Sequence, residues 1–253
     1  MKQYGYAFSA TGTTETIIKA FMDGASSSEY IDIASEYPEQ SFGEDDLVIV
    51  GIPVFGGRLP KVAPAHMAGL RGNGTPAVAI VTYGNREYED ALLELKMLLE
   101  AQGFKVVAAA AFIAQHSIAP SVAAGRPDAD DLVKVMDFAS AVTKKLQDAE
   151  SVAQIADFTV PGNFPHKPCN GIPYKPQADD MCIRCGSCAE KCPAKAIDPA
   201  SPNLTDANLC ITCMRCVAVC PVGARTLSHE LVQTITGKLN SICPHPKQPS
   251  IFM

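Results

Sequence analysis

The chain has 253 residues, of which 47% are hydrophobic and 19% charged, and its formal net charge is −6. This composition supports a buried core and excludes a globally disordered chain. Residues 1–160 carry 12 Lys and Arg against 21 Asp and Glu, whereas residues 161–253 carry nine against six, with no basic stripe typical of nucleic-acid binding. The longest apolar run, 106–114, is too short to span a membrane, and no secretory signal is recognisable, so we expect a cytoplasmic protein.

The first 150 residues alternate short apolar segments with amphipathic ones. The apolar segments have the continuous Val, Ile and Ala content of parallel strands that are buried on both faces. They span 2–8, 30–34, 46–54, 76–83 and 105–114. Helices are expected between and after them at 13–22, 60–70, 88–102 and 128–147. The alternation predicts an α/β fold with a doubly wound, five-stranded parallel sheet of flavodoxin-like order 2-1-3-4-5, occupying residues 1–156.

A proline-rich segment follows this α/β pattern. Residues 160–180 contain five prolines and two glycines, which predicts an extended connector at 157–179. We expect the connector to lie along a second domain, with Phe164 and Tyr174 as apolar anchors. The second domain is expected at 180–253 and ends in a proline-rich tail.

Eight of the ten cysteines lie in two segments, CIRCGSCAEKCP (182–193) and CITCMRCVAVCP (210–221), offset by 28 residues. Both follow C-x2-C-x2-C-x3-C-P, the bacterial ferredoxin pattern, in which the fourth cysteine of each run binds the other cluster. The pattern predicts a small α+β domain of the bacterial 2[4Fe–4S] ferredoxin type. Two zinc sites of four thiolates each are the alternative. The expected ligand sets are Cys182, Cys185, Cys188 and Cys220 for one centre, and Cys210, Cys213, Cys216 and Cys192 for the other.

Hydroxyl and glycine residues crowd the turn after the first strand, which reads SATGTT. This turn precedes a helix, so its backbone N–H groups and the positive end of the helix dipole favour a phosphate. Loops after the third and fourth strands, PVFGGRLP and TYGNREYED, end at the same edge of the sheet and suit a flat flavin ring. The candidate FMN-binding residues are Ser9, Thr11, Gly12, Thr13, Thr14, Pro53, Phe55, Gly56, Gly57, Tyr83, Gly84, Asn85 and Arg86.

Some side chains near this edge admit two interpretations. Phe55 and Tyr83 are candidates for stacking on the flavin ring, because the chain has no tryptophan. Arg58 and Arg86 either approach the ring or are solvated loop arginines. His116 is either a proton donor at the rim or a plain loop histidine.

The segments SATGTTE, PVFGGRLP and YGNREYEDALLEL, together with the two cysteine runs, resemble the fused flavodoxin–ferredoxin proteins of bacteria and archaea. This resemblance spans almost the whole chain. It implies bound FMN, two [4Fe–4S] clusters and electron transfer in low-potential metabolism, and it leaves the substrate open.

The leading functional hypothesis is intramolecular electron transfer between the clusters and FMN, serving as a low-potential redox carrier. The acidic first domain suits a basic redox protein partner, and a homodimer stays open. One alternative is a flavin-dependent reductase of a small molecule such as a quinone, and another is a cofactor-depleted redox sensor. No catalytic residue and no nicotinamide-binding fingerprint is recognisable, so whether the chain is an enzyme stays open.

Overall fold

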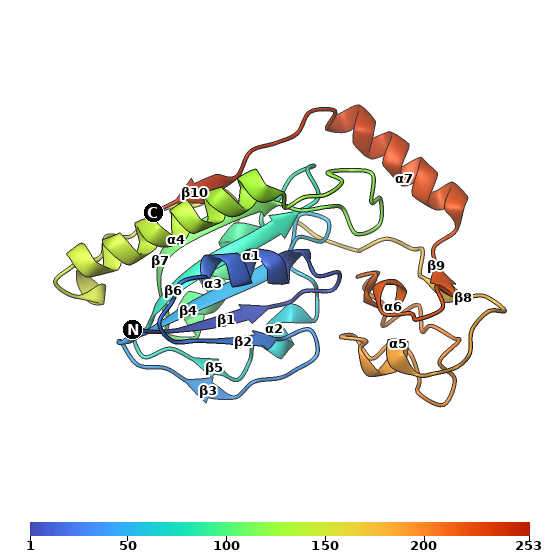
Figure 1. Cartoon of the computed structure of the whole chain (residues 1–253), viewed down its shortest axis with the longest axis horizontal. Helices are drawn as coiled ribbons and strands as arrows, with labels where there is room; N and C mark the ends of the chain where they lie inside the picture. Colours follow the sequence, from blue (N-terminus) through green and yellow to red (C-terminus); the bar gives the residue numbers. More distant parts are fainter.

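The first part of the chain forms one sheet between two layers of helices (Figure 1) in the computed structural model, which describes residues 1–253. Its parallel strands run in the order β2-β1-β4-β6-β7, which is the flavodoxin-like order predicted from the sequence. The fold prediction is therefore confirmed for this unit. The strands are β1 (Lys2–Ala7), β2 (Ser28–Asp32), β4 (Asp46–Pro53), β6 (Pro76–Tyr83) and β7 (Lys105–Ile113).

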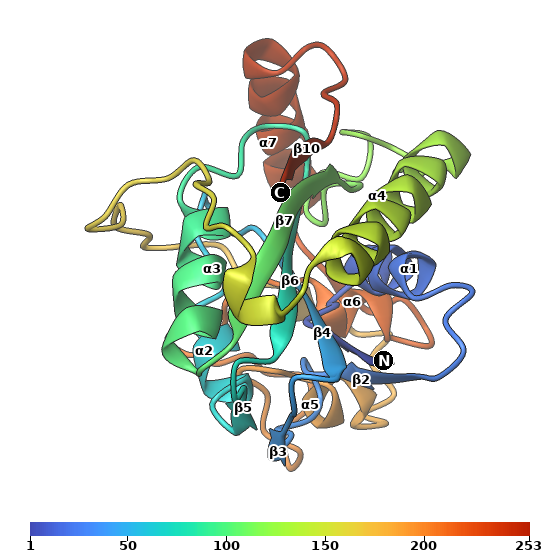
Figure 2. The same ribbon diagram turned by 90° about the vertical axis from the view of Figure 1, so that its left-hand side faces the viewer.

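Apolar side chains cover both faces of this sheet. On one face, α1 (Thr13–Phe21) and α4 (Ala129–Asp148) pack together, with the rings of Phe21 and Phe138 5.6 Å apart. On the other face lie α3 (Ala91–Ala101) and the short α2 (Ala63–His66), as Figure 2 shows. Neighbouring strand residues such as Ile49 and Val50 are buried in different clusters, which explains the continuous apolar pattern.

Two glycines allow α1 to pack closely against the sheet and allow the turn before it to form. A Cβ atom at Gly51 of β4 would lie 2.6 Å from Cγ1 of Ile18, so only glycine lets α1 lie this close to the sheet. Gly12 precedes the helix with a φ of 92°, a conformation that glycine adopts without strain. The helix N-terminus and the turn before it are thereby held at the carboxyl edge of the strands.

The expected helix at 60–70 forms only its central turn. After α2, the chain turns into β5 (Leu70–Arg71), which pairs with β3 (Gln40–Ser41) in a separate two-stranded sheet. The longest helix, α4, is amphipathic and begins with a capping box between Asp128 and Asp131. None of the helices is both long enough and apolar enough to cross a bilayer.

The connector lies mainly along the first unit. The wholly buried carboxylate of Asp90 accepts hydrogen bonds from the backbone N–H groups of Asn163 (2.9 Å) and Lys167 (2.7 Å). Phe158 and Val160 pack against the core of the same unit. A buried acceptor and an apolar face therefore fix this part of the connector.

The expectation that the connector is anchored on the second unit by aromatic residues is wrong. Phe164 is 72% exposed and Tyr174 is 54% exposed. Contact with the second unit begins at the backbone of Tyr174, whose carbonyl oxygen accepts a hydrogen bond from Thr212 Oγ1 (3.1 Å).

The second unit repeats its backbone conformation as well as its sequence. It holds α5 (Ser187–Glu190) and α6 (Arg215–Ala218), which lie side by side, and a two-stranded antiparallel pair, β8 (Gln177–Ala178) with β9 (Arg225–Thr226). Residues with positive φ recur at the offset of the cysteine runs, which is evidence of a duplicated unit. The pairs are Arg184 and Thr212, Gly186 and Met214, and Lys195 and Gly223.

The C-terminal segment returns to the first unit. A helix that the sequence analysis did not predict, α7 (His229–Ile242), leads to β10 (Ser250–Phe252), which pairs antiparallel with β7 (Figure 1). The sheet therefore has six strands and is mixed, whereas five parallel strands were predicted. We call residues 243–253 the C-terminal clasp.

Asn85 holds the clasp in place. Its Nδ2 donates to the carbonyl oxygens of Cys243 (3.3 Å) and His245 (3.0 Å), and its Oδ1 accepts from the backbone N–H of Lys247 (2.8 Å). Asn85 is only 5% exposed, so water cannot readily take over its hydrogen bonds to these three backbone groups.

We expect Asn85→Ala to loosen the clasp. The change leaves two carbonyl oxygens and one N–H without a partner, at a cost of about 1–3 kcal/mol. Amide hydrogen exchange in β10 should accelerate roughly 5- to 150-fold. Asn240→Ala, at an exposed position of α7, is the control and should leave exchange unchanged. Equal exchange in both variants would contradict this role of Asn85.

Candidate functional site

A cavity lies at the carboxyl edge of the sheet, where a doubly wound fold places its ligand. We call it the sheet-edge cavity. Residues from the loops after β1, β4, β6 and β7 line it. Among the predicted flavin-binding residues, the structure brings together Thr11, Thr13, Thr14, Pro53, Phe55, Gly56, Tyr83, Gly84 and Arg86.

The turn 9–14 is built to hold an anion. Ser9 Oγ accepts a hydrogen bond from the backbone N–H of Glu15 (3.0 Å), and Thr14 Oγ1 bonds Thr82 Oγ1 (2.7 Å), so these two hydroxyls fix the turn. The backbone N–H groups of residues 10–14 donate to no protein acceptor. Free N–H groups at the N-terminus of α1 fit a phosphate. Thr11 and Thr13 line the cavity beside them.

Phe55 and Tyr83 occupy different environments in the cavity wall. Tyr83 is 4% exposed and packs edge-on against Tyr88, with 5.4 Å between ring centroids. Burial raises the pKa of Tyr83, so its phenol stays protonated at neutral pH. Phe55 is half-buried and therefore more accessible to a ligand than Tyr83.

Four of the predicted residues do not line the sheet-edge cavity: Ser9, Gly12, Gly57 and Asn85. Ser9 and Gly12 shape the turn, and Asn85 bonds the clasp. Gly57 is buried, and a Cβ atom there would lie 2.2 Å from Glu89 Oε2. These residues support the loops around the cavity without lining it themselves.

His116 contributes a neutral imidazole to the cavity wall. Its Nδ1 accepts hydrogen bonds from the backbone N–H groups of Ile118 (3.2 Å) and Ala119 (3.1 Å), which leaves the proton on Nε2. Burial, with a smaller effect of Arg86, lowers the pKa of His116 to about 4. A Cβ atom at Gly84 would lie 2.5 Å from His116 Cδ2, so Gly84 makes room for this ring. From the sequence, Gly84 was predicted to bind the flavin.

Arg58 turns away from the sheet-edge cavity. Its guanidinium forms a two-point ion pair with Glu94, at 2.7 and 2.8 Å, and bonds the connector at the carbonyl oxygen of Lys167. Arg58 therefore fastens the connector to α3. Arg86 lines the cavity and pairs with Glu89 (2.5 Å).

Two further cavities lie in the second unit, and each borders four cysteines. The proximal cavity is lined by Cys192, Cys210, Cys213 and Cys216. The distal cavity is lined by Cys182, Cys185, Cys188 and Cys220. Each cavity thus takes three cysteines from one run and the fourth from the other, as the assigned ligand sets require. No group of three or more His, Cys, Asp or Glu side chains is drawn together around a single metal ion.

The surroundings of these cavities suit a sulfur-bound cluster. The backbone N–H of Ala196 donates to Cys192 Sγ (3.3 Å) and that of Thr212 to Cys210 Sγ (3.4 Å), as expected of hydrogen bonds that tune cluster sulfurs. Burial raises the pKa of the free Cys213 thiol to about 12 and of the free Cys216 thiol to about 11. Burial therefore favours the neutral form of these two thiols while no metal is bound, and metal binding requires that they lose their protons.

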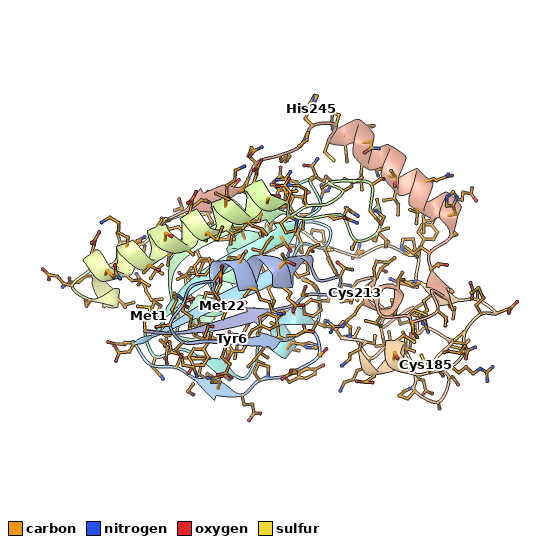
Figure 3. All side chains as sticks on the ribbon, viewed as in Figure 1. Met1, Tyr6, Met22, Cys185, Cys213 and His245 are labelled. Carbon is orange, nitrogen blue, oxygen red and sulfur yellow. The ribbon has the colours of Figure 1, made fainter.

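The three cavities follow one another in space. Cys213 lines both the sheet-edge cavity and the proximal cavity. Cys216 of the proximal set and Cys188 of the distal set pack together with Ile197 in one apolar cluster. Cys185, in the distal set, is the one exposed cysteine of the chain. Figure 3 shows Cys213 on the side facing the sheet and Cys185 at the far end.

Arg215 and His66 hold the two units together. Arg215, 8% exposed, donates to the carbonyl oxygen of Ser9 (3.0 Å), to Asp32 Oδ2 (2.5 Å) and to Ser35 Oγ (2.8 Å). His66 Nε2 bonds the carbonyl oxygen of Pro193, next to Cys192, at 3.0 Å. Neither residue was predicted from the sequence, because each contacts a partner that lies more than 100 positions away in the chain.

The sequence model of the 4Fe-4S dicluster domain family matches residues 181–225. The C-terminal unit is a 4Fe-4S dicluster domain. Together with the flavodoxin-like sheet, it gives the chain the architecture of a flavodoxin–ferredoxin fusion, as the resemblance implied. These two units support a role in redox electron transfer.

Several solved structures are similar to this chain. A flavodoxin from the domain Archaea has 17% identity and a TM-score of 0.42, covering 58% of this chain and 99% of that one. Flavodoxin 1 from Bacillus cereus has 16% identity and a TM-score of 0.36, covering 57% and 98%. The rubredoxin oxygen:oxidoreductase of Desulfovibrio gigas has 15% identity and a TM-score of 0.41, covering 57% and 35%. No curated protein matches the chain.

A double-mutant cycle should detect the bond between the units. For Arg215→Met and Asp32→Ala we expect a coupling free energy of about 1.5–3 kcal/mol in denaturant unfolding, because both charges are largely shielded from water. The exposed pair Lys2 and Glu29 is the matched control and should give about 0.2–1 kcal/mol. A coupling no larger than that of the control pair would contradict the docking role of Arg215.

Proposed function

We propose that the chain binds FMN in the sheet-edge cavity and one [4Fe–4S] centre in each cysteine cavity, and that it transfers electrons between them within one molecule. When bound, iron–sulfur centres exchange single electrons and a flavin accepts one or two, so the fusion joins one-electron to two-electron chemistry. The observation that carries this proposal is the position of Cys213, which borders the proximal and the sheet-edge cavities together.

The residues around the sheet-edge cavity divide the task of holding FMN. The free N–H groups of residues 10–14, with Thr11 and Thr13, would bind the phosphate. Phe55 would cover the ring, and the backbone at Gly56 leaves space for it. His116 offers an N–H donor from Nε2, and Arg86 offers a positive charge that favours an anionic ring.

The dicluster domain keeps its two centres in different surroundings. The cysteines at 213 and 216 in the proximal set are buried, so the protein shields that centre from water. The distal set opens to solvent at Cys185, and the nearby residues Ile183 (63%) and Met181 (65%) are also exposed. We propose that a redox protein partner exchanges electrons at this exposed end, and that the protein works in the cytoplasm.

A second candidate function is the flavin-dependent reduction of a small molecule such as a quinone. The observation in its favour is His116, a neutral N–H donor in the cavity wall. Turnover of an added quinone at a rate above that of free FMN would support it. Loss of that turnover in His116→Ala, with FMN still bound, would identify the donor.

Metal analysis tests the interleaved ligand sets. Anaerobically purified protein should contain one FMN and about eight irons per chain. The double variant Cys192→Ser/Cys210→Ser alters only the proximal set and should keep about four irons. Cys192→Ser/Cys182→Ser alters both sets and should lose nearly all iron. The opposite distribution would show that each run binds its own centre, and zinc without flavin would overturn the proposed function.

Replacing one hydroxyl tests the phosphate site. Thr11→Val removes a donor from the cavity and should weaken FMN binding by about 1.5–3 kcal/mol, or roughly 10- to 150-fold in Kd. Fluorescence titration of the apoprotein with FMN measures the change. Thr143→Val, at an exposed position of α4, is the control and should leave Kd unchanged. Unchanged binding in Thr11→Val would place the phosphate elsewhere.

A further inference from the structure

Arg225 is a buried arginine without an acidic partner. It lies on β9 in the dicluster domain, is 1% exposed, and is among the largest fully buried side chains of the protein. None of the ion pairs of the chain includes it, whereas the other buried arginine, Arg215, is paired with Asp32. Buried charges are normally paired or bound to a metal site, because removing a charge from water is costly.

Every hydrogen-bond acceptor of the Arg225 guanidinium is a neutral oxygen. Nη1 donates to Thr205 Oγ1 (2.7 Å) and to the carbonyl oxygen of Pro176 (3.4 Å). Nη2 donates to the carbonyl oxygens of Pro202 and Leu204, the latter at 3.2 Å. Nε is buried with no acceptor. Dipoles therefore hold the guanidinium in place, but no protein group neutralises its charge.

The distal cavity is where a negative partner for Arg225 would lie. Arg225 lines the distal cavity together with its four cysteines. Cys188 Sγ lies 3.4 Å from the carbonyl oxygen of Pro202, to which Arg225 donates, so the guanidinium and this cysteine lie against the same atom. A [4Fe–4S] centre with four thiolates carries net negative charge, which a buried cation would balance.

We propose that Arg225 is a positioning residue that balances the charge of the distal [4Fe–4S] centre and raises its reduction potential. The inference rests on the proposed function, because it requires iron–sulfur centres in these cavities. One-electron reduction adds one negative charge to the centre, with no bond made and no proton bound. A buried cation in a site of low dielectric constant stabilises that added negative charge more than an exposed cation does, because water screens the charge of the exposed cation.

The test uses the anaerobic holoprotein and three variants. Arg225→Gln removes the charge and keeps a polar side chain, and Arg225→Lys keeps the charge. Arg184→Gln is the matched control, because Arg184 lines the same cavity but is exposed, so that water screens its charge. Dithionite supplies electrons one at a time, and EPR-monitored titration gives the midpoint potential of each centre.

In Arg225→Gln we expect the potential of one centre to fall by at least the equivalent of a tenfold change in the one-electron equilibrium constant, about 59 mV. Arg225→Lys should lose less than half of that, and Arg184→Gln less than a third. If Arg225→Gln cannot retain iron, retention in Arg225→Lys would support the need for charge.

Several outcomes overturn the inference. One is an unchanged potential in Arg225→Gln, and another is a shift in Arg184→Gln as large as that in Arg225→Gln. A third is equal loss of iron in both Arg225 variants, which would make Arg225 a packing residue. Wild-type protein without iron–sulfur centres would instead refute the proposed function, and the iron count distinguishes this case before any potential is measured.

Discussion

The contact of Arg215 with the turn after β1 is the constraint on which the arrangement of the two units depends. One guanidinium binds the carbonyl oxygen of Ser9, where the candidate phosphate site begins, and the carboxylate of Asp32. The next residue along the chain is Cys216, in the proximal set. The same bonds that dock the dicluster domain therefore place Cys213 in the wall of the sheet-edge cavity.

Segments on both sides of the dicluster domain are bound to the first unit, and they keep the two units in contact. Before the domain, the connector is bound to the first unit at Asp90. After the domain, α7 leads to the clasp, which Asn85 and the edge of β7 hold. A linker of this length without such contacts would let the domains move independently, which is the usual behaviour of small inter-domain interfaces. Both termini of the second unit are fixed to the first one.

The sequence predicted those features that depend on local pattern or on exact spacing. Continuous apolar runs indicated strands buried on both faces, and the 28-residue offset indicated the interleaved cysteine sets that now border the two cavities. It did not predict β10, because three residues carry no periodicity. The roles of Asn85, Arg58 and Gly84 were missed for a related reason: each is decided by a partner from a distant segment, whether the clasp, α3 or His116.

We expect electrons to move between the sheet-edge cavity and the cysteine cavities within one molecule. A flash-induced, one-electron reduction of the anaerobic holoprotein measures this most directly, with the absorbance bands of flavin and iron–sulfur centres followed over time. We expect the electron to redistribute between these bands with an observed rate constant that is independent of protein concentration. An observed rate constant that rises in proportion to protein concentration would instead show that transfer occurs between separate molecules.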